Sequence, residues 1–175
     1  VGFFYMFSVI FPGQGSQFVG MGKEFYDNFD LVKNQFKEAD EVLQFPLSKI
    51  ILEGPKEDLD LTINTQPAIF LISYSIFNVV KKEFNIDLNE AKYFAGHSLG
   101  EYSALSCAGY LSFSETIKVL RIRGDAMQNS VPKGEGGMVA VLGSTIQTVE
   151  EILKNNEEKF KVQIANDNSV GQIVL

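Results

Sequence analysis

The stretch Tyr93-Phe94-Ala95-Gly96-His97-Ser98-Leu99-Gly100 decides the fold, because it joins a short apolar strand to a helix through a tight turn. The turn has the spacing Gly-x-Ser-x-Gly, in which small flanking residues allow the close approach that a strained strand-to-helix turn requires. It projects the Ser98 hydroxyl outward and directs the Leu99 N–H and the positive helix end toward a developing oxyanion. The pattern predicts a nucleophilic Ser98. The alternative is that Ser98 only caps a helix and that the glycines serve the turn.

The elements expected before this turn follow from periodicity and from Gly and Pro positions. The apolar stretch 1–11 ends at Pro12-Gly13 and predicts a buried strand. A helical stretch follows, with Val32, Phe36, Ala39 and Leu43 on one face, and it is expected to end at Gly54-Pro55. Thr65-Gln66-Pro67 is expected to open a buried helix, with Pro67 in the tolerated first turn.

After the turn, a helix is expected from Ser98 through Cys107, and Ser112 with Glu115 forms a capping box for another helix running to about Gln128. The Gly-rich stretch 131–137 then predicts a boundary that divides the chain into residues 1–130 and 131–175. Beyond it we expect a strand at Met138–Leu142, a helix at Thr145–Asn155, and strands at Lys161–Ala165 and from Gln172.

Alternating strands and helices predict an α/β fold with a parallel sheet for the first part, and the second part is expected to open a small α+β subdomain. Among 175 residues, 45% are hydrophobic and the net charge is −7. This composition excludes general disorder and argues against a sequence-independent nucleic-acid binder. One cysteine excludes an internal disulfide or a thiolate zinc site and favours the cytoplasm. Ala68–Val80 is too short and too polar to span a membrane.

The single histidine limits the possible mechanisms. His97 adjoins Ser98, so its ring is expected to point away from the hydroxyl and to have a structural role. Cys107 is expected to be a small core residue. Of Arg121 and Arg123, one is expected to be solvated. An inward Arg123 would suit a carboxylate.

A Gly-rich turn, Phe11 to Gln17, resembles a phosphate-binding loop only superficially. A dinucleotide fingerprint would need glycine where Phe18 stands, and the Gly-Lys-Ser/Thr ending of a P-loop is absent. Either the glycines serve a turn at a strand end, or the loop forms a second wall of the active site and supplies another N–H.

The blocks Phe11–Gln17, Thr65–Ala68, Gly96–Leu105 and Arg123–Gln128 together resemble the malonyl-CoA:acyl carrier protein transacylase family, in the same order and over essentially the whole chain. The resemblance implies a hydrolase-like parallel-sheet core, followed by the beginning of an inserted ferredoxin-like subdomain. It also implies transfer of malonyl from CoA to the phosphopantetheine thiol of acyl carrier protein, through a malonyl-serine, in fatty acid synthesis. No metal or other cofactor is expected.

Residue roles implied by the resemblance are as follows. Ser98 would be the nucleophile, and the backbone N–H groups of Gln14 and Leu99 would form the oxyanion hole. Arg123 would pair with the malonyl carboxylate, and Met127 and Asn168 would line the pocket. The family is longer and has its catalytic histidine further downstream, so the chain is expected to be truncated before the base. The alternatives are an inactive remnant that binds acyl-CoA or carrier protein, and a less favoured serine esterase.

Overall fold

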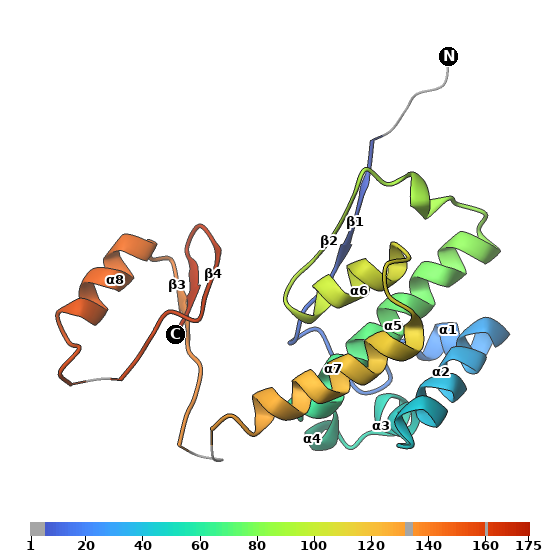
Figure 1. Cartoon of the computed structure of the whole chain (residues 1–175), viewed down its shortest axis with the longest axis horizontal. Coiled ribbons are helices and arrows are strands. Elements are labelled where there is room, and N and C mark those ends of the chain that lie inside the picture. The colour runs from blue at the N-terminus through green and yellow to red at the C-terminus, as the bar shows by residue number, and fades with distance from the viewer. Residues whose placement is uncertain (1–5, 132–134, 160) are drawn as a thin grey trace. The chain divides into compact units, whose positions relative to one another are not determined.

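Residues 6–131, 135–159 and 161–175 are described by this computed structural model, and they form two compact units, Val1–Ser130 and Val131–Leu175 (Figure 1). The part of the expected first strand at residues 1–5 and the boundary positions 132–134 lie outside the described residues.

A two-stranded parallel sheet organises the first unit. Strand β1 (Ser8–Phe11) pairs with β2 (Tyr93–Gly96), and Phe11 is aligned with Gly96. One face of the sheet is closed, because Phe11 packs in a cluster with Phe77, Ala104 and Cys107. The other face is open, and Ile10 is 75% exposed. The prediction of a buried strand therefore holds for the face that carries Phe11 and is wrong for the face that carries Ile10. Parallel sheets are usually covered on both faces, and the described residues cover one.

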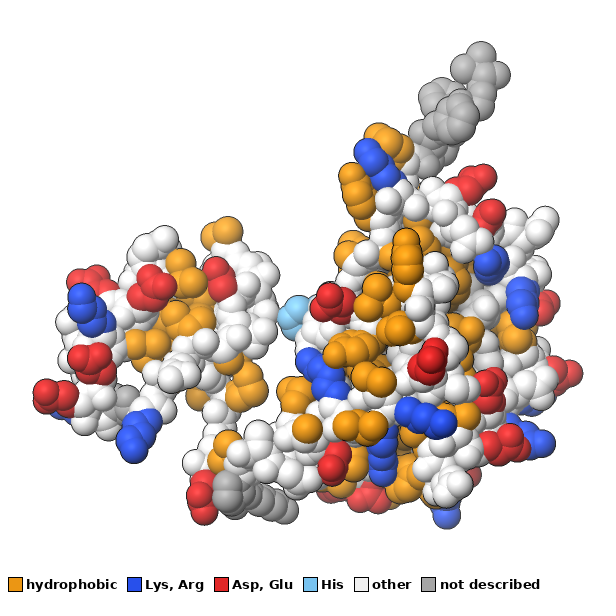
Figure 2. Space-filling view, in the orientation of Figure 1, with side chains coloured by type: hydrophobic (Ala, Val, Ile, Leu, Met, Phe, Trp, Pro, Cys, Tyr) orange, Lys and Arg blue, Asp and Glu red, His pale blue; other side chains and the backbone are white. Residues whose placement is uncertain are grey.

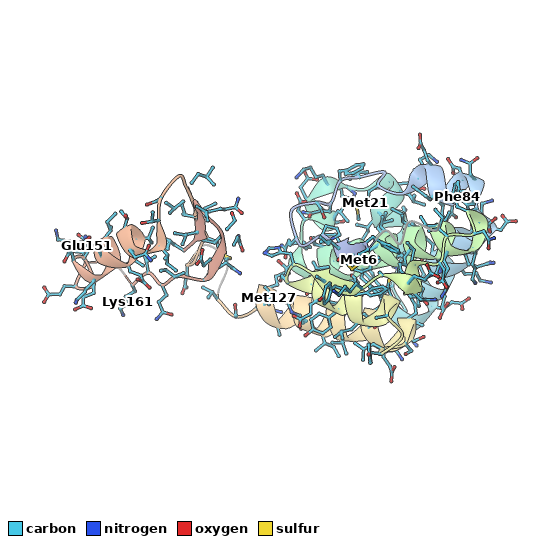
Figure 3. The ribbon with its side chains drawn as sticks, turned by 90° about the horizontal axis from the view of Figure 1, so that it is seen from above. Met6, Met21, Phe84, Met127, Glu151 and Lys161 are labelled. Carbon is cyan, nitrogen blue, oxygen red and sulfur yellow. The ribbon has the colours of Figure 1, made fainter. Side chains whose placement is uncertain are left out.

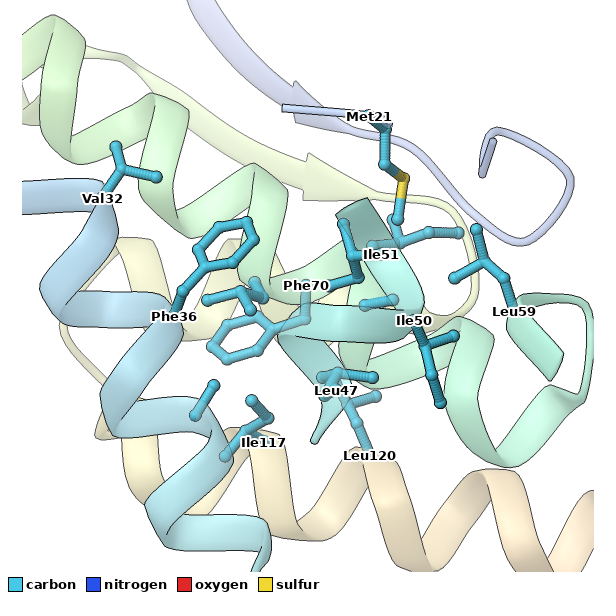
Figure 4. Packing of buried hydrophobic residues seen from close by; sticks show 14 of the residues in the cluster. Met21, Val32, Phe36, Leu47, Ile50, Ile51, Leu59, Phe70, Ile117 and Leu120 are labelled. Atoms are coloured by element: carbon cyan, nitrogen blue, oxygen red, sulfur yellow. The ribbon is translucent and has the colours of Figure 1, made fainter. Parts of the chain in front are cut away.

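Helices supply most of the first unit and its main core. The elements are α1 (Lys23–Asn28), α2 (Asp30–Leu43), α3 (Leu47–Glu53), α4 (Lys56–Leu59), α5 (Thr62–Glu83), the short 3-10 helix η1 (Leu88–Glu90), α6 (Leu99–Cys107) and α7 (Phe113–Gln128). The predicted stripe on α2 is confirmed: Val32, Phe36 and Ala39 are buried. They pack with Phe70 of α5 and Ile117 of α7 (Figure 4). This core fixes the helices whose ends build the site.

Two helix boundaries differ from the prediction. The helix expected to continue to Gly54-Pro55 is divided, because Gln44 has a left-handed backbone (φ 48°) after α2 and Pro46 precedes α3. Helix α5 begins at Thr62, so Pro67 lies inside it and not in its first turn. A proline at this position removes the N–H that would bond the Ile63 carbonyl. Arg121 of α7 donates to that carbonyl at 3.3 Å and so replaces the lost bond.

Helices α5 and α7 approach closely at Gly124. A Cβ atom at Gly124 would lie 2.6 Å from the Thr62 carbonyl oxygen and 2.7 Å from Ile63 Cα.

Among the described residues, α5 is the one helix long and apolar enough to cross a membrane, yet 61% of its most apolar stretch is buried inside the protein. Helix α5 is therefore the central helix of the first unit.

An antiparallel sheet of order β3-β5-β4 forms the second unit with helix α8 (Ile146–Lys154). The strands are β3 (Ala140–Leu142), β4 (Asn166–Ser169) and β5 (Gln172–Val174). The predictions of β5 and α8 are confirmed, but the strand expected at Lys161–Ala165 is wrong. Strand β4 starts at Asn166 because a tight turn at Gly171 (φ 82°) sets the pairing with β5. Cross-strand pairing here outweighs the low strand propensity of Asn-Asp-Asn-Ser.

Candidate active site

The turn between β2 and α6 holds Ser98 in a strained conformation. Its backbone has φ 55° and ψ −113°, in a region that residues other than glycine rarely adopt. A Cβ atom at Gly96 would overlap the Gly100 carbonyl carbon, at 1.9 Å, and one at Gly100 would lie 2.6 Å from the Phe11 carbonyl oxygen. Both glycines are therefore required by close backbone contacts. Ser98 is exposed at the carboxyl end of β2, which is the arrangement expected of a nucleophile.

Arg123 of α7 points to this serine. Its Nη2 donates to Ser98 Oγ at 3.1 Å, and its Nη1 donates to Gln66 Oε1 at 2.7 Å. The guanidinium also lies 5.8 Å from the ring centre of Tyr102 on α6. Contacts from α5 and α6 thus hold the positive charge of the α7 arginine beside the hydroxyl. The planar guanidinium can donate two hydrogen bonds to a carboxylate at the same place.

Gln66 was missed as a functional residue. Thr65-Gln66-Pro67 was predicted only as the start of a helix, with no role for Gln66. Its side chain is fully buried, and its Nε2 contacts Met127 Sδ at 3.2 Å while its Oε1 accepts from Arg123. A buried glutamine needs partners for both ends of its amide. No local signal distinguished Gln66 from Asn64 and Thr65, which are polar and buried in the same helix.

Arg121 is partly buried and bonded within the protein, which corrects the expectation that one of the two arginines would be solvated. Its Nη1 donates to the Ile63 carbonyl and to Asn64 Oδ1, and its guanidinium lies 4.0 Å from the Phe45 ring centre. Arg121 therefore ties α7 to the start of α5, whereas Arg123 reaches the nucleophile.

The Gly-rich loop that follows β1 lies close to the turn that bears Ser98. A Cβ atom at Gly13 would lie 2.5 Å from His97 Nδ1 and 2.8 Å from the His97 carbonyl oxygen, so the Gly-rich loop touches the turn that bears Ser98. Leu99 is the first residue of α6, where a backbone N–H has no partner within the helix. Within the described residues, no hydrogen bond uses the N–H of Gln14 or of Leu99.

Met127 lies near the end of α7 (Figure 3). It is 45% exposed, and its Sδ contacts Gln66 Nε2 at 3.2 Å. Asn168 lies on β4 of the second unit and borders a cavity of about 340 Å³ with Thr145, Gln147 and Asp167. The pocket role of both residues stays a prediction.

Cys107 is buried, as expected, and burial raises the pKa of its thiol to about 12. This thiol is a core group and not a second nucleophile. Within residues 6–131, 135–159 and 161–175, no cluster of three or more His, Cys, Asp or Glu side chains could hold a metal ion.

Exposed hydrophobic side chains are spread over the surface of the first unit (Figure 2). An apolar groove of about 450 Å³ lies between β1 and α5 and is lined by residues including Ile10, Phe18, Ile72 and Ile76. This groove is separate from the polar contacts of Ser98 and Arg123. The described polar contacts of the site join the Ser98 hydroxyl and the Arg123 guanidinium.

Residues 8–174 match the protein family described as the acyl transferase domain. The malonyl CoA-acyl carrier protein transacylase of Bacillus subtilis (strain 168) is 47% identical over 167 residues, which are 95% of this chain and 51% of that protein. The crystal structure of acyl-carrier-protein-S-malonyltransferase from Bartonella henselae is similar with a TM-score of 0.90 and 46% identity, over 97% of this chain and 54% of that one.

A type II PKS acyl-carrier protein in complex with its malonyl-transacylase is also similar, with a TM-score of 0.88 and 37% identity over 97% of this chain and 54% of that one. The chain therefore spans about half the length of the relatives that it matches.

Proposed function

Because this chain belongs to the acyl transferase domain family, we propose that it carries the nucleophile of a malonyl-CoA:acyl carrier protein transacylase. The observation that carries this assignment is the Arg123 guanidinium, which donates to Ser98 Oγ at 3.1 Å. A neutral-ester hydrolase would have no use for a fixed positive charge at that position. The esterase alternative is therefore less favoured.

Ser98 Oγ would attack the thioester carbonyl of malonyl-CoA and lose its proton to a base. The tetrahedral intermediate would collapse with loss of the CoA thiolate and leave a malonyl-serine ester. The phosphopantetheine thiol of the carrier protein would then attack this ester and release Ser98, so that the two half-reactions form a ping-pong cycle.

Arg123 would select the acyl group. In malonyl, one methylene separates the thioester carbonyl from the free carboxylate, so the carboxylate must bind close to the attacking oxygen. The short distance between Arg123 Nη2 and Ser98 Oγ suits such a group. The buried Gln66 holds the other side of the guanidinium and leaves its fork directed at the substrate. Acetyl has no carboxylate to use this charge.

The backbone N–H groups of Gln14 and Leu99 would stabilise the oxyanion. Both donors are unused among the described hydrogen bonds, and both belong to turns that touch through Gly13 and His97. One such donor is typically worth about 10²–10³ in rate. No metal or redox cofactor enters these steps, and we propose the cytoplasm as the compartment. The partners would be malonyl-CoA and an acyl carrier protein, as in the similar complex of a type II PKS acyl-carrier protein with its malonyl-transacylase.

His97 would not serve as the base. His97 is the one histidine of the chain, and its ring lies against Gly13. General-base assistance is typically worth about 10²–10⁴-fold. The position of the one histidine against Gly13 favours a second candidate function for the 175 residues alone. In this function they bind acyl-CoA or carrier protein without turnover.

Labelled malonyl-CoA and a phosphopantetheinylated acyl carrier protein test the proposal. Wild type should transfer label to the carrier, and Ser98→Ala should not. Arg123→Ala should lose malonyl transfer more than acetyl transfer. Equal transfer by wild type and Ser98→Ala would exclude the acyl-serine mechanism. Saturable binding of malonyl-CoA without any transfer would instead support the second candidate.

A further inference from the structure

The Gly-rich loop between β1 and α1 is held by the side chain of Gln17. Gln17 Oε1 accepts from the Gly15 N–H at 2.8 Å, and Gln17 Nε2 donates to Asp60 Oδ1 at 2.9 Å. Asp60 follows α4, so this one amide joins the loop to a rigid part of the helical layer. Gln14 adds a weaker attachment, since its Nε2 donates to Thr62 Oγ1 at 3.3 Å.

The pairing requires a glutamine. A backbone N–H can only donate and an ionised carboxylate can only accept, so the bridging group must offer one acceptor and one donor. A carboxylate at position 17 would satisfy Gly15 but would face Asp60 with the same charge. Asp60 is kept ionised, because hydrogen bonds from Lys56 and then from Gln17 lower the pKa of its carboxyl group. The orientation of the Gln17 amide is therefore determined by its two partners.

The Gln17 side chain also determines which backbone N–H of the loop has no partner. The turn Gly13-Gln14-Gly15-Ser16 presents several N–H groups in a row, and Gly15 has a left-handed φ of 105°. Gln17 occupies the Gly15 N–H, whereas the Gln14 N–H has no partner among the described residues. The next loop bond, from Gly20 N–H to the Ile51 carbonyl at 2.7 Å, fixes the far end of the loop.

We propose that Gln17 is a positioning residue that, anchored on Asp60, occupies the Gly15 N–H and presents the Gln14 N–H to the oxyanion at Ser98. This inference rests on the proposed function, because it assumes that Ser98 is acylated. Gln17 itself touches neither the substrate nor the reacting atoms. It acts through the loop, because its described hydrogen bonds go to Gly15 and Asp60 and not to Arg123.

A charge-swap series tests this assignment. Gln17→Glu places a carboxylate against Asp60, and Asp60→Asn alone keeps an acceptor for the Gln17 amide. In the double variant Q17E/D60N, the asparagine amide can donate to the new carboxylate, whose second oxygen can still accept from Gly15. The readouts are the single-turnover rate of Ser98 acylation, the dissociation constant of malonyl-CoA and the exchange rate of the Gly15 amide hydrogen.

We expect Q17E to slow acylation by about tenfold or more, since a misplaced oxyanion donor loses part of its typical worth of about 10²–10³. The dissociation constant should change less than about threefold, because Arg123 holds the carboxylate. Gly15 exchange should accelerate in Q17E, and Q17E/D60N should restore both the rate and the protection.

Three results would overturn the assignment: wild-type acylation by Q17E, no rescue in the double variant, or unchanged Gly15 exchange in Q17E. If wild type itself is not acylated, the proposed function fails. Gly15 exchange across the series then still decides whether Gln17 and Asp60 hold the loop.

Discussion

Gly124→Ala changes a single hydrogen to a methyl group at the closest approach of α5 and α7. The new Cβ would lie 2.6 Å from the Thr62 carbonyl oxygen and 2.7 Å from Ile63 Cα, whereas comfortable carbon contacts are about 3.5–4.0 Å. Both neighbours are backbone atoms, which cannot rotate away. The two helices must therefore separate by close to an ångström.

Two effects oppose each other in this variant. Alanine is favoured over glycine inside a helix by about 1 kcal/mol. Overpacking a closed contact typically costs about 1–3 kcal/mol, and a contact between backbones belongs to the upper part of that range. We therefore expect a net loss of about 1–2 kcal/mol in the free energy of unfolding. The displacement should also pull Gln66 away from Arg123, because Thr62 and Ile63 begin the same helix as Gln66.

Urea denaturation followed by circular dichroism measures this change, and the exposed Lys118→Ala on α7 is the matched control, with an expected change within about 0.5 kcal/mol. Stabilisation of Gly124→Ala by about 1 kcal/mol would mean that helix propensity alone operates, and it would refute the close approach of α5 and α7.

Three further predictions concern separate features. Gln66→Leu should raise the dissociation constant of malonyl-CoA about tenfold or more, because Arg123 loses its buried acceptor; an unchanged value by calorimetry would remove Gln66 from the anchor. Cys107 should resist iodoacetamide at pH 8 in the folded protein and react on unfolding, since burial raises its pKa to about 12; rapid native labelling would contradict this. Hydrogen bonds from Ser112 lower the pKa of Glu115, so the capping box stabilises α7 above the unfolded pKa of that carboxyl and is lost as the pH falls through the folded pKa. Ser112→Ala should therefore lower the melting temperature at pH 7 more than at pH 3, and equal losses at both values would argue against the box.

Local patterns predicted a large part of this fold. The elbow around Ser98, the capping box of α7 and the buried stripe of α2 depend on residues close in sequence, and the structure confirms these elements. Steric and hydrogen-bonding rules act over a few residues, so the sequence contains enough to predict them.

The errors arise where distant segments meet. Pro67 could lie inside α5 because Arg121, far along the chain, bonds the carbonyl that the proline leaves free. Strand β4 replaced the more apolar Lys161–Ala165 because pairing with β5 fixes it. The role of Gln66 depends on the crossing of α5 and α7 and was invisible in the sequence. The guanidinium that contacts Ser98 could be named in advance only through resemblance, since either arginine of α7 could have faced inward.

The central claim is that Ser98, held beside Arg123, takes the malonyl group, and the most direct measurement is the mass of the chain after incubation with malonyl-CoA. The account predicts one malonyl adduct, located by peptide mapping to the peptide that contains Ser98, and its absence in Ser98→Ala. An adduct on another residue, or equal modification of both proteins, would contradict it.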